Sequence, residues 1–125
     1  MISDILLYVG AGVITLWGIA HVIPTKAVVN GFGQISQDNK RIITMEWIAE
    51  GLTLCFIGVL VLLVTVFAGL QNQVSNIVYW ASATMLVVMA ILTASTGART
   101  SILPIKICPV VNIAVAILFI LGAVL

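Results

Sequence analysis

Four long apolar stretches run along the chain, and short polar links separate them. Each stretch can form a helix of about 20 residues, which at 1.5 Å per residue crosses a ~30 Å hydrocarbon layer. Consecutive spans joined by short links run antiparallel and pack together as a bundle. The pattern therefore predicts an all-α fold: an antiparallel four-helix transmembrane bundle in one domain, residues 1–125, with spans at about 2–23, 38–70, 76–94 and 103–125.

The link between the first two spans is broken by Pro24, Gly31 and Gly33. Its apolar side chains allow the 24–35 segment to lie in the headgroup layer or to dip back as a short re-entrant piece, and a plain loop is the alternative. Ser36 or Asp38 is placed to cap the second span. That span is longer than the hydrocarbon layer requires, so it must tilt or protrude at one end.

The composition excludes a soluble domain. The chain has 125 residues, of which 62% are hydrophobic and only 7% are charged, with a net charge of +1. Such a balance is typical of an integral membrane protein and offers no basic face for nucleic acid. We expect its partners to be the lipid bilayer and either a second copy or another membrane protein.

The basic residues predict the orientation. All five lie in or beside the links at 24–39 and 95–103, and the middle link has none; they are Lys26, Lys40, Arg41, Arg99 and Lys106. Links rich in lysine and arginine stay on the cytoplasmic side. We therefore expect these two links in the cytoplasm and both termini outside, in a cytoplasmic-type (cell inner) membrane.

Two carboxylates enter the second span one helical turn apart. Glu46 and Glu50 share a helix face, and Thr53 continues it. An acid inside a spanning helix costs about 2.5–3.5 kcal/mol, so such acids usually face protein or a water-filled cavity. His21, at the end of the first span, lies at about the same membrane depth, and the first-span residues Gly10, Ala11, Ile14, Gly18 and His21 form one inward stripe.

These residues suggest a polar site inside the bundle. The candidates for binding a ligand or a proton are His21, Glu46, Glu50, Trp17, Thr53 and Asn30. The alternative is structural: Glu46 pairs with a nearby cation, Lys26, Lys40 or Arg41, and His21 caps its helix. Met85 and Met89 are expected to fill packing gaps.

No cofactor is expected. Metal binding needs at least three ligands, and the paired Glu-x-x-His pattern of carboxylate bundles is missing. A single histidine is also too few for bis-histidine haem ligation. Cys55 and Cys108 show no metal-binding spacing, so we expect neither a metal nor haem.

The segment Gly18-Ile19-Ala20-His21-Val22-Ile23-Pro24, followed by Val29-Asn30-Gly31-Phe32-Gly33, resembles the DoxX-like group of small four-helix membrane proteins. The resemblance covers about the first half of the chain. It implies a four-helix bundle that serves as an accessory subunit of a membrane oxidoreductase or another redox-linked complex. The segment around Glu46 and Glu50 has no counterpart in that pattern, so no catalytic residue is carried over.

Three functions fit these features. The first is an accessory or partner subunit of a membrane complex, with the Glu/His group as a polar contact site. The second is a small proton-coupled transporter that uses Glu50. The third is a membrane enzyme on a lipid-like substrate, in which His21 and Glu46 or Glu50 transfer protons.

Overall fold

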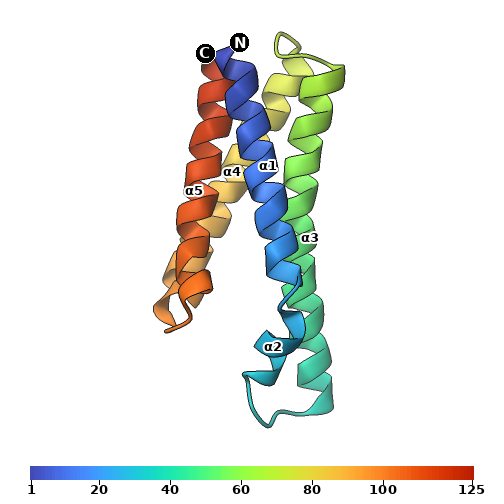
Figure 1. The fold of residues 1–125 in the computed structure, drawn as a ribbon, viewed down its shortest axis with the longest axis vertical. Helices are drawn as coiled ribbons and strands as arrows, with labels where there is room; N and C mark the ends of the chain where they lie inside the picture. Colours follow the sequence, from blue (N-terminus) through green and yellow to red (C-terminus); the bar gives the residue numbers. More distant parts are fainter.

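The computed structural model describes residues 1–125 and is entirely helical apart from its turns. Four long helices form an antiparallel bundle, as the hydropathy pattern predicted, and both termini lie at the same end (Figure 1). The elements are α1 (Ile2–Val22), α2 (Thr25–Asn30), α3 (Gln37–Phe67), α4 (Gln73–Ser95), the 3₁₀ turn η1 (Gly97–Arg99) and α5 (Leu103–Val124).

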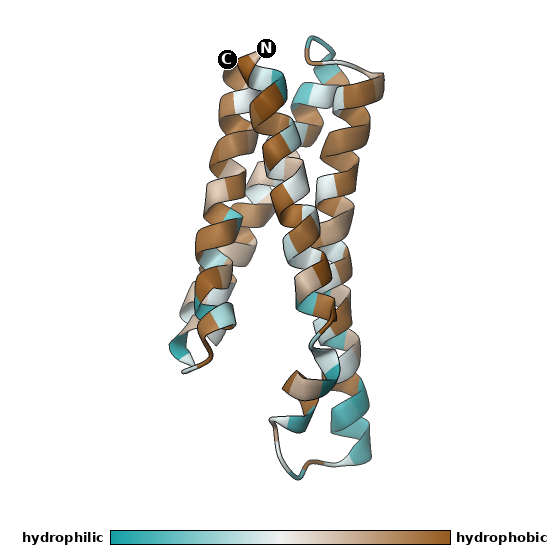
Figure 2. Ribbon diagram, viewed as in Figure 1, coloured by the Kyte–Doolittle hydropathy of each residue, from teal (hydrophilic) through white to brown (hydrophobic).

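The four long helices are each long and apolar enough to cross a membrane. Apolar side chains also cover their outer faces, where Leu16, Phe56 and Ile91 are all more than half exposed. Hydrophilic residues gather instead at the start of α3 and near α2 (Figure 2). An exterior of this kind is suited to lipid, and the chain is an integral multi-pass membrane protein.

Capping residues set where the helices begin. The Ser36 hydroxyl accepts a hydrogen bond from the Asn39 amide at 3.1 Å, so Ser36 rather than Asp38 caps α3. The Asn72 side chain accepts one from the Val74 amide at 2.8 Å, so α4 begins at Gln73 rather than near residue 76. In α5, Pro104 occupies the first turn and Pro109 lies inside the helix.

The segment after Pro24 is a short helix rather than a plain loop. Pro24 ends α1, and the six residues of α2 then pack against α3. At 1.5 Å per residue, α2 is only about 9 Å long, so it cannot cross the membrane. Gly33, at φ 75°, turns the chain back into α3.

The long helices form two pairs. α1 packs along α3 and α4 packs along α5, while α1 also contacts α5 and joins the pairs. α3 and α4 contact each other little. The pairs meet at the end that carries the termini and diverge toward α2 and η1 (Figure 1). The bundle is therefore closed at one end and spread at the other.

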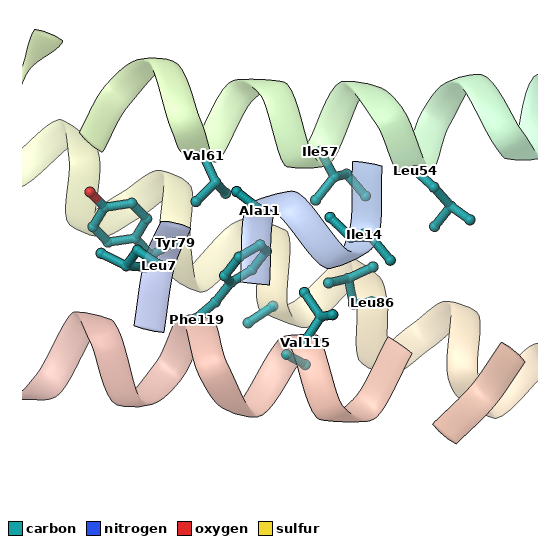
Figure 3. Close-up of a cluster of buried hydrophobic side chains, with 12 residues drawn as sticks. Leu7, Ala11, Ile14, Leu54, Ile57, Val61, Tyr79, Leu86, Val115 and Phe119 are labelled. Carbon is teal, nitrogen blue, oxygen red and sulfur yellow. The ribbon is translucent and has the colours of Figure 1, made fainter. Parts of the chain in front are cut away.

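A hydrophobic core fills the closed half. Leu7, Ala11 and Ile14 of α1 lie between α3 and α5 (Figure 3). The other members are Leu54, Ile57, Val61, Tyr79, Ala83, Leu86, Val115, Ala116 and Phe119. All four long helices contribute, so this core fixes the relative positions of the two pairs.

Small residues bring α1 and α3 into close contact. Gly10, Ala11, Ile14 and Gly18 are buried as the stripe predicted, and His21 is partly buried beside them. A methyl group added at Gly18 would lie 2.7 Å from the Gly51 carbonyl oxygen, so the two backbones touch at this level. Small residues allow such close approach between membrane helices.

Tyr79→Phe should lower the free energy of unfolding by about 1 kcal/mol. Tyr79 is 1% exposed, and its hydroxyl lies 2.8 Å from the Thr65 hydroxyl, which itself donates to the Val61 carbonyl at 2.6 Å. Tyr79 is thus the donor that links α4 to α3 at the closed end. Unfolding by detergent titration measures the loss. Tyr8→Phe, on an exposed tyrosine, is the control, and equal stabilities for the two variants would contradict the prediction.

Candidate functional site

A half-enclosed cavity of about 900 Å³ lies between the two helix pairs. It occupies the half of the bundle where the pairs diverge, and every long helix supplies part of its wall. Its size falls within the range of pockets that hold drug-sized ligands. Its lining includes Trp17, His21, Glu46, Trp47, Glu50, Thr53, Met85, Met89, Thr93 and Cys108.

His21 and Glu50 meet in this cavity. The His21 Nε2 atom lies 3.4 Å from Glu50 Oε2, and the two side chains are 10% and 32% exposed. The contact follows from the close packing of α1 and α3. Glu50 directly precedes Gly51, which faces Gly18 one turn before His21. The contact lies at ion-pair distance and is not a hydrogen bond, because His21 Nε2 is buried without a hydrogen-bond partner, and a proton on the imidazole would strengthen its attraction to the carboxylate.

Trp47 holds His21 in place from the neighbouring turn of α3. Its ring stacks on the imidazole with centroids 3.9 Å apart and an interplanar angle of 17°. Its Nε1–H donates to the His21 carbonyl oxygen at 2.7 Å. That carbonyl lies in the last turn of α1, where backbone acceptors lack partners within the helix. One side chain thus satisfies the helix end and orients the ring.

Glu46 lies on the same wall, one turn nearer the start of α3. Its side chain is exposed and lines the cavity. The ion pairs of the structure are Met1 with Asp4 and His21 with Glu50, so Glu46 does not form the pair with a basic neighbour that the structural alternative required. Glu46 and Glu50 therefore both face the cavity.

The other candidates divide into two groups. Trp17 and Thr53 line the same cavity. The Trp17 Nε1 atom is buried without a hydrogen-bond partner, and the Thr53 hydroxyl donates to Ala49 O in its own helix. Asn30 lies elsewhere, in a second groove beside α2, because the turn after Pro24 carries it away from α1.

The opposite wall comes from α4 and α5. Met85, Met89 and Thr93 line it from α4, and Cys108 lines it from α5. The two methionines, expected only to fill packing gaps, thus supply flexible, polarizable surface to the cavity. Their spacing of four residues, which continues to Thr93, is the sequence signal that they share a face. No sequence pattern indicated that this face lies opposite Glu50.

The charge of the lining is one-sided. Glu46, Glu50 and His21 are its ionisable groups besides the Cys108 thiol, and no lysine or arginine lines the cavity. The histidine, cysteine and carboxylate side chains do not form a group of three that could hold a metal ion. Two carboxylates among aromatic and aliphatic side chains favour a ligand that is apolar and carries a positive charge.

Comparison with protein-family models, with curated proteins and with solved structures gave no match. The DoxX-like resemblance therefore stays a prediction. The function has to be argued from the cavity itself.

Proposed function

We propose that this protein binds lipophilic organic cations in the cavity between its helix pairs and exchanges them for protons at Glu50. The observation that carries the proposal is the lining: a cavity of about 900 Å³ with two carboxylates, two tryptophans and no basic side chain except the histidine. This proposal develops the hypothesis of a small proton-coupled transporter. The cavity accounts for the carboxylates and the imidazole without a second protein, so we prefer it to the accessory-subunit hypothesis.

Glu50 is suited to act as the exchange site. It is about one-third exposed, so both a ligand and water can reach it, and His21 lies beside it as a second proton carrier. An ionised carboxylate attracts a cation, and a protonated one does not. Proton binding at Glu50 would therefore release the ligand. By the distribution of basic residues we place the open end of the cavity on the cytoplasmic side.

Tetraphenylphosphonium should bind the purified protein, whereas tetraphenylborate, an anion of the same shape, should bind at least tenfold more weakly. Both probes fill an apolar cavity, and only the cation gains from the carboxylates. Quenching of tryptophan fluorescence reports binding, because Trp17 and Trp47 line the cavity. Trp80→Phe removes a fluorophore outside it. Equal affinities for the two probes would reduce the site to an apolar pocket and overturn the proposal.

A second candidate function rests on the His21–Glu50 distance of 3.4 Å. A histidine and a carboxylate within reach of a bound molecule can serve as a general acid and base, and the cavity leaves room for a lipid-like substrate beside them. The two functions are separable, because an enzyme changes its ligand and a transporter returns it unaltered. Mass spectrometry of lipid extracts incubated with wild type and His21→Gln distinguishes them.

A further inference from the structure

A second groove, of about 610 Å³, lies between α2 and the first turns of α3. It is on the other side of α3 from the cavity. Basic and amide side chains dominate its lining. The residues are Ile23, Thr25, Lys26, Val29, Asn30, Gln37, Lys40, Arg41, Thr44 and Met45. Three of the five basic residues of the chain therefore share one groove, and no carboxylate lines it.

The basic side chains of this groove form no ion pair within the protein. Neither ion pair of the structure includes Lys26, Lys40 or Arg41. Like charges gathered in one groove repel one another, and an anion placed among them relieves the repulsion. The side-chain amides of Asn30 and Gln37 add hydrogen-bond donors that no other protein group uses. The positive charge and the amide donors suit an oxyanion such as a phosphate.

The position of the groove favours a lipid headgroup, rather than a free ion, as the source of such an oxyanion. α3 has 31 residues and is about 46 Å long, so it exceeds a ~30 Å hydrocarbon layer by several turns. Its hydrophilic start, together with α2, extends beyond the ends of α4 and α5 (Figure 2). Ile23 and Met45, 77% and 58% exposed, offer apolar surface at the groove for an acyl chain. A charged head beside an apolar tail describes a phospholipid.

We propose that this groove binds the phosphate headgroup of an anionic phospholipid, with Lys26, Lys40 and Arg41 as its cationic ligands. Each basic side chain near an anionic membrane surface strengthens binding about fivefold. Arginine can hold two phosphate oxygens at once, and lysine acts as a point charge. The site is independent of the cation-binding cavity, so either proposal can fail without the other.

The test compares two pairs of basic residues. Lys40→Gln/Arg41→Gln removes two charges from the groove, and Arg99→Gln/Lys106→Gln removes the two charges of the other basic link. Delipidated protein in a neutral detergent is titrated with phosphatidylglycerol, or with phosphatidylcholine of the same acyl chains, and bound lipid is counted by native mass spectrometry. We expect preference for phosphatidylglycerol and at least tenfold weaker binding in the groove variant, with the other variant unchanged.

Four outcomes decide the proposal. Equal losses in the two variants would show general surface charge and overturn it, as would equal binding of the two lipids. Wild-type binding in Lys40→Arg/Arg41→Lys, which keeps both positive charges, would support the proposal. It would also show that the Gln variant binds more weakly because it has lost those charges. Inorganic phosphate or glycerol 3-phosphate binding as tightly as the lipid would overturn the lipid assignment, because the acyl chains would then contribute nothing.

Discussion

Gly18→Ala is expected to destabilise the folded protein by about 1–3 kcal/mol, the usual cost of inserting a methyl group where packing leaves no room. The added carbon would lie 2.7 Å from the Gly51 carbonyl oxygen and 2.8 Å from the Cys55 amide nitrogen. Both are backbone atoms of α3, which cannot rotate aside as a side chain can. The helices must therefore separate, and the contacts along their interface weaken together.

Gly12→Ala is the matched control, because a methyl group there meets nothing within 4 Å. Alanine favours a helix over glycine by up to about 1 kcal/mol, so this variant should be as stable as wild type or slightly more stable. Unfolding of both variants in mixed micelles by sodium dodecyl sulfate, followed by tryptophan fluorescence, gives the two differences. If Gly18→Ala unfolds at the wild-type detergent concentration, the close packing of α1 and α3 is not a source of stability.

The same substitution should also disturb the site. Gly18 lies one turn before His21, and Gly51 directly follows Glu50. Separation of the helices at this level increases the distance between His21 Nε2 and Glu50 Oε2 beyond 3.4 Å. Stability and cation binding should therefore fall together in Gly18→Ala, whereas neither should fall in Gly12→Ala.

The sequence predicted the spans and the facing of Glu46 and Glu50 because both follow from one-dimensional periodicities. Hydropathy marks a helix that can cross the bilayer, and a separation of four residues places two side chains on one face. His21 and Glu50 were expected at comparable membrane depths, and this alone predicted that they are close, without information on helix packing. These inferences needed only the rise per residue and the direction of each span.

The rest depended on which helices pack together and how tightly. Gly51 and Gly58 in α3 are seven residues apart, as are Ala11 and Gly18 in α1, and this matched spacing is typical of helices that pack closely over two turns. Only the stripe in α1 was recognised from the sequence. Without its match in α3, the pairing of the helices, and hence the divergence that opens the cavity, could not be predicted.

The opposite wall was missed for the same reason. Met85 and Cys108 line one cavity with Glu50 only because α4 and α5 diverge from α1 and α3 toward η1 (Figure 1). Asn30, predicted to belong to the site, lies only nine residues after His21 in the sequence. The turn after Pro24 instead places it in the basic groove. The periodicity of a sequence predicts neither which helices pack together nor where a turn reverses the chain.

Glu50→Gln should weaken the binding of tetraphenylphosphonium ten- to hundredfold, which corresponds to about 1.4–2.7 kcal/mol. The substitution keeps the shape of the side chain and removes its charge. A pair of unit charges about 4 Å apart at a protein surface attracts by about 4 kcal/mol, and desolvation of both groups offsets part of this. Glu46→Gln should have a smaller effect, because Glu46 is more exposed and its charge is better screened.

The pH dependence of binding gives the stronger test. If Glu50 exchanges the ligand for a proton, acid removes the negative charge that attracts the cation, and a proton on His21 would add a repelling charge, so affinity should rise with pH. Glu50→Gln removes the first contribution and should flatten the profile, leaving what His21 and Glu46 supply. Asp4→Asn, at the other end of α1, should retain the wild-type affinity and profile. If Glu50→Gln keeps the steep pH dependence of the wild type, the proton acts at another group. Proton exchange at Glu50 would then have no basis.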